Sequence, residues 1–281
     1  MRHRYACPLR WADLDLLGHV NNVTYVDYLQ EARVDLLRAL TPQESPTDPD
    51  EGVLVVSTDI TYLAPLKFRY GSVFVDTWVC EVRAASFALA YEIYDEREGE
   101  RILYARARTV LTPYVFSRKA PRRLTAPERT RLIEAMEPDE PVRPTPIRAV
   151  VSELGHFALH TRFSDLDIYG HVNNVKYVEY FQEGRGALLT RASQAVGRRA
   201  SGGHVVAQVR IEYVRPLLYR EQPYDLFTSV SHLGTKSMTM EAEIRDGDVV
   251  CARARAAVVF YDPEAGASAP IPDDLRKHLT Q

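Results

Sequence analysis

The chain has 281 residues, about twice the length of a typical single domain, so two domains are expected. With 46% hydrophobic and 26% charged residues, its composition is that of a folded globular protein and excludes a disordered or low-complexity one. The formal net charge of −3, from 35 basic and 38 acidic residues, predicts no general attraction to nucleic acid or to an anionic membrane.

The first elements in chain order are a short strand, a loop and one long helix. The helix is expected to begin at Asn21 and Asn22, because an asparagine side chain can accept a hydrogen bond from an N–H group of the first turn. It should run to about Leu40 and end at Pro42. Its polar residues fall on one side and apolar residues cover most of the rest, which predicts a helix largely surrounded by protein.

Four segments rich in β-branched and aromatic residues follow and are predicted to be strands: 53–64, 72–84, 86–95 and 102–115. One helix followed by sequential strands indicates an α+β fold, in which an antiparallel sheet curls around the helix. A short helix is expected at 126–136, within a proline-rich segment that closes the unit.

The second half of the chain repeats the first. Residues 10–33 and 162–185 are identical at 16 of 24 positions with a constant offset of 152, and residues 60–66 match 211–217. A repeat of this length is too long for a solenoid, so each copy should be a domain. We expect an N-terminal domain at 1–125, a closing helix and linker at 126–152, and a C-terminal domain at 153–281.

Neither a cofactor nor a metal ion is expected. The chain contains no P-loop, no G-x-S-x-G elbow, no G-x-G-x-x-G fingerprint and no H-E-x-x-H motif. Its three cysteines, Cys7, Cys80 and Cys251, have neither metal-ligand nor disulfide-framework spacing, which favours reduced thiols in the cytoplasm. The N-terminal residues lack the apolar run of a signal peptide, and no stretch approaches the roughly 18 apolar residues of a membrane span.

The segment Asp-Leu-Asp-x-x-Gly-His-Val-Asn-Asn-Val-x-Tyr opens the long helix in both copies. It resembles the signature of hot-dog-fold thioesterases, in particular the 4-hydroxybenzoyl-CoA thioesterase-like group and the acyl-ACP thioesterases. The resemblance implies two tandem hot-dog domains, fused as an intrachain pseudo-dimer. It also implies an acyl-CoA thioesterase that hydrolyses acyl or aroyl thioesters to free acid and CoA. The partner would be acyl-CoA, with acyl carrier protein as the alternative carrier, and the chains could form a homo-oligomer.

Hydrolysis of a thioester requires few catalytic groups. Its thiol has a pKa of about 8.5, so it leaves as a thiolate without a general acid. A carboxylate must activate water or attack the carbonyl, and donors must stabilise the oxyanion. The family pattern assigns the first role to the second aspartate of each motif, Asp15 and Asp167, as nucleophile or general base. It places the oxyanion donors among the backbone N–H groups near Asn22 and Asn174.

The other repeated residues of the motif are predicted to support these groups. The histidines could orient the carboxylate, the thioester carbonyl or a water molecule, the first aspartates should hold the loop, and the glycines should allow the turn and a close approach of substrate. The residues concerned are His19, His171, Asp13, Asp165, Gly18 and Gly170.

Two alternatives stay open. Acyl-ACP thioesterases of plants carry an asparagine where this chain has Leu17 and Tyr169, which disfavours a carrier-protein substrate. A non-catalytic acyl-CoA-binding module is disfavoured because both copies keep their carboxylates.

The arginine pairs of the last strands, 106/108 and 253/255, are expected to be solvent-facing strand charges, with a clamp on CoA phosphates as the alternative. Tyr62 and Tyr213 are expected to end strands and not to contact substrate.

Overall fold

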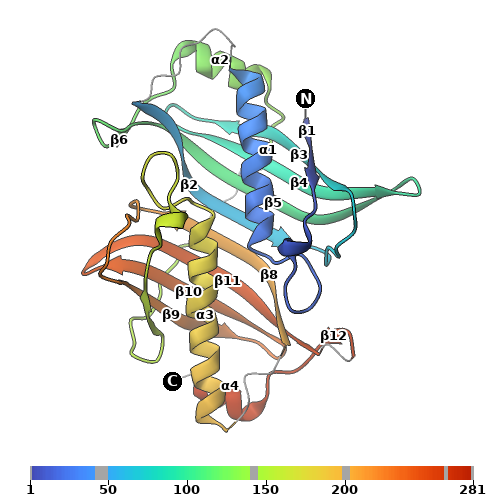
Figure 1. Cartoon of the computed structure of the whole chain (residues 1–281), viewed down its shortest axis with the longest axis vertical. Helices are drawn as coiled ribbons and strands as arrows, with labels where there is room; N and C mark the ends of the chain where they lie inside the picture. Colours follow the sequence, from blue (N-terminus) through green and yellow to red (C-terminus); the bar gives the residue numbers. More distant parts are fainter. Residues whose placement is uncertain (1, 42–49, 140–144, 198–202, 263–264, 280–281) are drawn as a thin grey trace. The chain divides into compact units, whose positions relative to one another are not determined.

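The structure is a computed structural model that describes residues 2–41, 50–139, 145–197, 203–262 and 265–279. The chain divides into two compact units, Met1–Arg143 and Pro144–Gln281. In each unit one long helix lies across one face of an antiparallel sheet (Figure 1). The predicted α+β class, with one long helix against an antiparallel sheet in each copy, is therefore confirmed.

Unit 1 contains the elements β1 (His3–Pro8), α1 (Thr24–Leu40), β2 (Glu51–Tyr62), β3 (Ser72–Val82), β4 (Phe87–Arg97), β5 (Glu100–Val115), β6 (Ala120–Pro121) and α2 (Ala126–Glu134). The strands pair in the order β1-β3-β4-β5-β2, and β6 is added to β5. All of these pairs are antiparallel, and the four predicted strands agree with β2 to β5 to within a few residues.

Helix α1 begins at Thr24, which is two residues later than predicted. Asn21 lies before the helix, and its Oδ1 accepts a hydrogen bond from the Val23 amide at 3.1 Å. The side chain thus bonds an amide as expected, but that of the residue preceding the helix and not one of its first turn. The helix ends at Leu40, as predicted. Pro42, the predicted stop, lies outside the described residues.

The core of unit 1 lies between α1 and the sheet. Leu29 and Ala32 of α1 are fully buried, as are Leu89 of β4 and Leu111 of β5. The C-terminal half of α1 is less covered than predicted, since Val34 is 39% exposed. Arg33, in contrast, is buried on the inner face of the helix.

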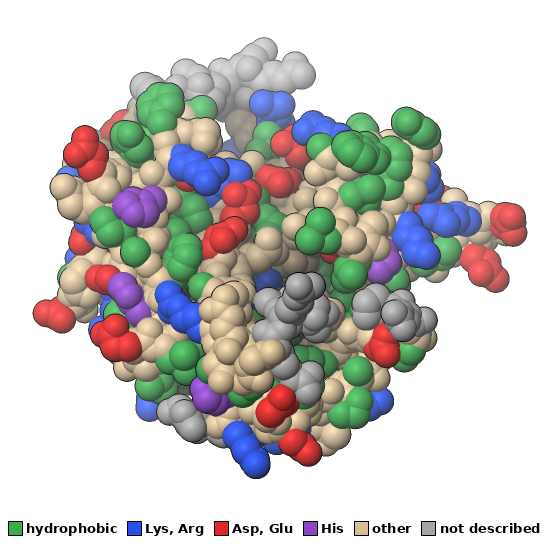
Figure 2. All heavy atoms as spheres, turned by 60° about the horizontal axis from the view of Figure 1, so that its bottom comes forward, with side chains coloured by type: hydrophobic (Ala, Val, Ile, Leu, Met, Phe, Trp, Pro, Cys, Tyr) green, Lys and Arg blue, Asp and Glu red, His purple; other side chains and the backbone are tan. Residues whose placement is uncertain are grey.

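Unit 2 repeats this arrangement with β7 (His156–Leu159), α3 (Lys176–Ala195), β8 (Gly203–Tyr213), β9 (Tyr224–Leu233), β10 (Ser237–Asp246), β11 (Val249–Asp262), β12 (Ala267–Ser268) and α4 (Asp273–Leu279). Its strand order is β7-β9-β10-β11-β8, in which each strand is the repeat counterpart of the strand at the same place in the order of unit 1. In the described part of the chain no helix is both long and apolar enough to cross a bilayer. On the face shown in Figure 2, acidic and basic side chains lie intermixed.

Helix α2 is attached to unit 1 through its N-terminus. Thr125 and Glu128 form a reciprocal capping box, in which the Thr125 amide donates to the Glu128 carboxylate at 2.7 Å. Arg122 bonds this carboxylate and also that of Glu51 on β2. The hydrogen bond from Arg122 lowers the pKa of Glu128 to about 2.

We expect Glu128→Gln to destabilise the protein at neutral pH and to matter less as the solution is acidified. A carboxylate whose pKa is lowered by folding stabilises the protein above its ordinary value of 4.5, and this contribution is lost as pH falls towards 2. Urea unfolding at pH 7, 4, 3 and 2.5 measures the difference between the two proteins. Glu134→Gln, at an exposed position of the same helix, is the control. A stability difference that is the same at pH 7 and pH 2.5 would contradict this assignment.

Candidate active site

The loop that precedes α1 folds back on itself. Asp15 and His19 are joined by a backbone hydrogen bond of 2.7 Å from the Asp15 amide, and Leu14 pairs with Val20 as an antiparallel bridge. Gly18 closes the turn with φ +74°, a conformation that favours glycine. A side chain at this position would meet nothing within 4 Å, so the backbone angle, and not a lack of space, explains the glycine. Gly170 has φ +76° in the second copy.

The Asp15 carboxylate is held from one side only. Its Oδ1 accepts the amides of Leu17 at 2.8 Å and His19 at 3.1 Å, whereas Oδ2 makes no hydrogen bond within the described part of the chain. One oxygen therefore sets the orientation of the carboxylate, and the other can receive a proton or reach an electrophile.

The second copy holds its carboxylate in the same way. Asp167 Oδ1 accepts the amides of Tyr169 at 2.9 Å and His171 at 3.2 Å. His19 and His171 thus contact the aspartates through their backbone, and the predicted role of their imidazoles stays a prediction.

The first aspartate of each motif connects the loop to the helix. Asp13 Oδ2 accepts the Arg10 amide at 2.8 Å and the hydroxyl of Tyr28, a buried residue of α1, at 2.6 Å. Burial, and then the hydrogen bond to Asp13, raise the pKa of the Tyr28 phenol, which keeps it protonated as a donor. Asp165 repeats both contacts, with Arg162 at 2.7 Å and with Tyr180 at 2.6 Å. These contacts are of the kind expected for loop-holding residues.

Strands β2 and β8 end at tyrosines that also contact the start of the long helix. The hydroxyl of Tyr62 donates to the carbonyl of Asn22 at 2.7 Å, and that of Tyr213 donates to the carbonyl of Asn174 at 3.1 Å. Tyr62 packs edge-on against Tyr25, with the ring centres 5.2 Å apart. The two tyrosines therefore end their strands as predicted, but they also position the helix start. This second role was missed, although their recurrence in both copies was a signal for it.

Not every amide at the helix start is available to a substrate. Asn21 accepts the amide of Val23 with its side chain at 3.1 Å and that of Thr24 with its carbonyl at 2.9 Å. The amide of Asn22 donates no hydrogen bond within the described residues, and its buried side-chain Nδ2 has no partner there. Asn22 therefore offers two donors, one of them in the side chain.

The recurring arginines of the last strands are bound to glutamates of neighbouring strands. Arg106 donates to Glu92 at 3.1 Å and Arg253 donates to Glu243 at 3.2 Å. Burial by itself would raise the pKa of Glu92, but hydrogen bonds from Arg101 and Arg106 outweigh it and hold the pKa below its ordinary value. These contacts support structural strand charges, and not a phosphate clamp, as the role of the arginines.

The same holds for the second arginine of each pair. Arg108 contacts Glu81, and Arg255 donates to Glu241 at 2.9 Å. Among the described residues, no three His, Cys, Asp or Glu side chains lie together as a group that could hold a metal ion.

The fold and the duplicated loop define a class of enzyme, the double hot-dog thioesterases. The family model of the thioesterase-like superfamily matches residues 9–153 and again 161–279. The chain belongs to this superfamily, and it is a thioester hydrolase.

Solved structures of thioesterases share the fold along nearly the whole chain. A Lactobacillus plantarum protein, provisionally assigned as an oleoyl thioesterase, is similar with a TM-score of 0.75 and 16% identity, over 92% of this chain and 96% of that one. The 12:0-ACP thioesterase from Umbellularia californica has a TM-score of 0.74 and 16% identity, over 92% and 94% of the two chains. An acyl-ACP thioesterase from Bacteroides thetaiotaomicron has a TM-score of 0.67 and 17% identity, over 92% and 97%. At these identities the likeness shows the fold alone.

Removing the hydroxyl that anchors the first aspartate should loosen the loop. We expect Tyr28→Phe and Tyr180→Phe each to lower the free energy of unfolding by about 1–3 kcal/mol, because a hydrogen bond to a charged, partly buried group is lost. Denaturant unfolding measures this change. Tyr70→Phe is the matched control, because Tyr70 is 95% exposed. If the Tyr28 and Tyr180 variants are as stable as the control, the anchoring role is wrong.

Proposed function

We propose that the protein hydrolyses acyl-CoA thioesters to free acid and CoA, with Asp15 and Asp167 as the catalytic carboxylates. The observation that carries this proposal is the way in which each carboxylate is held. Two loop amides bind one oxygen and leave the other without a hydrogen bond in the described chain. A carboxylate in this state is oriented and can still act as a nucleophile or a base.

Two routes use this oxygen, and both consume one water molecule. In the first, Asp15 Oδ2 adds to the thioester carbonyl, the C–S bond breaks, and CoA leaves as a thiolate. Water then hydrolyses the resulting anhydride and restores the carboxylate. In the second, the carboxylate takes a proton from water as the water oxygen adds to the carbonyl, and the departing thiolate receives a proton. Neither route needs a separate acid for the leaving group, because the pKa of a thiol is only about 8.5.

The developing oxyanion needs donors at the start of the helix. Asn22 has both a backbone amide and a buried Nδ2 without acceptors in the described chain, and these are our candidates. A buried donor left without a partner costs about 1–3 kcal/mol, so such a donor favours a ligand oxygen beside it. The positive end of the helix dipole adds to this stabilisation. Removing one such donor typically lowers the rate by about 10²–10³-fold.

CoA is the carrier we propose. Leu17 and Tyr169 occupy the position at which plant acyl-ACP thioesterases carry an asparagine. Turnover of acyl carrier protein substrates in preference to acyl-CoA would replace this part of the proposal.

We further propose a cytoplasmic location. It is supported by the three cysteines, which are all free and buried. Burial raises the pKa of the Cys7 thiol to about 12 and that of Cys80 to about 11, which is typical of buried structural thiols of low reactivity.

The catalytic carboxylates are tested by Asp15→Asn and Asp167→Asn, singly and together. Asparagine keeps the Oδ1 atom that accepts the loop amides, so the fold should be retained. We expect each single variant to keep about half of the turnover if the two sites act independently. The double variant should lose at least about 100-fold. Release of CoA from a panel of acyl-CoA and aroyl-CoA substrates, followed with a thiol reagent, measures the rates.

Asp248→Asn, an exposed aspartate in the turn between β10 and β11, is the control and should be fully active. Wild-type turnover in the double variant would rule out the carboxylate mechanism. Tight binding of acyl-CoA by the unmutated protein without turnover would instead establish a binding module.

A further inference from the structure

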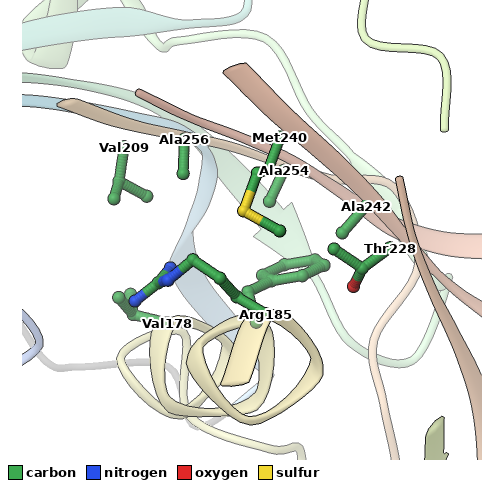
Figure 3. Close-up of a pocket in the computed structure, with 9 residues that line it drawn as sticks. Val178, Arg185, Val209, Thr228, Met240, Ala242, Ala254 and Ala256 are labelled. Carbon is green, nitrogen blue, oxygen red and sulfur yellow. The ribbon is translucent and has the colours of Figure 1, made fainter. Parts of the chain in front are cut away.

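A cavity lies in unit 2 between α3 and the sheet (Figure 3). Apolar side chains form most of its wall, among them Met240, Ala242 and Ala256. Arg185 of α3 is the one charged side chain among the lining residues, and its exposure is only 5%. The cavity thus combines a small apolar space with a cationic donor group.

The repeat shows how unit 1 differs at this place. Tyr91 pairs with Ala107 across β4 and β5, and Ala242 pairs with Ala254 across β10 and β11, so Ala242 occupies the register position of Tyr91. By the same register, the pair of Met240 with Ala256 corresponds to the pair of Leu89 with Thr109.

In unit 1 the equivalent space is filled by the phenol of Tyr91, which is 1% exposed. Its hydroxyl lies 2.7 Å from Thr109 Oγ1, and its side chain also forms a hydrogen bond with Arg33. In unit 2 alanines replace both Tyr91 and Thr109, whereas Arg185 keeps the position of Arg33. Unit 2 therefore has the arginine but lacks the phenol that its counterpart in unit 1 binds.

The cavity is placed to receive part of a substrate. Val178, near the start of α3, and Arg185 both line it, and their backbone positions are about 10 Å apart along the helix at 1.5 Å per residue. Side chains on a helix lean towards its N-terminus, and Figure 3 shows the guanidinium of Arg185 extending towards Val178. The donor group is thus directed towards the end of α3 that follows the Asp167 loop.

We propose that this cavity binds the far end of the acyl group and selects a short acyl chain that ends in an oxygen acceptor, either a hydroxyl or a carboxylate. The oxygen would bond to Arg185 as the phenol of Tyr91 does to Arg33, since a guanidinium offers several N–H donors to an entering oxygen. Unit 1 would not share this selectivity, because Tyr91 occupies the corresponding space. This inference rests on the proposed thioesterase function and adds a substrate class and a difference between the two sites.

Binding is measured by titration calorimetry in the Asp15→Asn, Asp167→Asn protein, which should not consume its ligands. The probes are glutaryl-CoA with a carboxylate end, 4-hydroxybutyryl-CoA with a hydroxyl end, and butyryl-CoA with a methyl end. We expect one or both oxygen-ended probes to bind at one site per chain, about tenfold or more tighter than butyryl-CoA. The order of the first two probes distinguishes the carboxylate from the hydroxyl.

Two variants of the cavity should remove this preference. Ala242→Tyr introduces the residue of unit 1, which fills the space and gives Arg185 a phenol partner. Arg185→Gln removes the cation and leaves the space, which provides a second measurement if Ala242→Tyr folds poorly. Tyr91→Phe in unit 1 is the control, because it keeps that space filled and should not change the preference. Melting temperatures without ligand verify that each variant is folded.

The inference is overturned if the three probes bind equally well, or if the preference persists in both Ala242→Tyr and Arg185→Gln. Failure of the proposed function looks different. In that case the protein with both catalytic aspartates intact would release no CoA from any member of the substrate panel, whatever the state of the cavity.

Discussion

The hydrogen bond between the Asp13 carboxylate and the Tyr28 hydroxyl is the contact on which the rest of the site depends. It joins a loop with little core of its own to a helix whose inner face is fully buried. Once the loop is held there, the backbone turn at Gly18 presents the amides of Leu17 and His19 to Asp15. The catalytic geometry that we propose therefore depends on α1, which holds the loop in place through the hydroxyl of Tyr28.

The two aspartates of each motif have different hydrogen-bond partners. Asp13 accepts a side-chain donor from the helix core, so its contacts fasten the loop. Asp15 accepts only loop amides and keeps one oxygen without a hydrogen bond in the described chain. Two carboxylates two residues apart therefore differ in their contacts because one faces the helix and the other faces the turn. The same division holds for Asp165 and Asp167.

The two copies have the same loop contacts but differ in the packing between the long helix and the sheet. Both loops keep the same hydrogen bonds to within a few tenths of an ångström, whereas the space next to the buried arginine is filled in unit 1 and open in unit 2. A change from tyrosine to alanine alters the volume next to the arginine without touching the backbone that carries the carboxylate. The space beside the arginine can therefore differ between the copies while the contacts of the loop carboxylates stay the same.

The amino-acid sequence alone determined the repeat, the α+β class, the strands and the motif residues. Periodicity, turn residues and identical positions are local or one-dimensional signals, and each of them can be read without coordinates. The helix start was placed two residues early because Asn21 and Asn22 both look like caps, and only the folded loop shows that Asn21 alone accepts the Val23 amide. The burial of Arg33 was not predicted, since helical spacing alone does not show which face a sheet will cover.

Only the tertiary structure decided which groups meet. Tyr62 reaches Asn22 across 40 positions of sequence, and Arg33 meets Tyr91 from a different element. Contacts of this kind depend on strand register and on how the helix packs against the sheet, and no local pattern encodes either one. The residues of the candidate site could therefore be chosen from the sequence, but the partners that orient them, and the cavity beside Arg185, follow from packing.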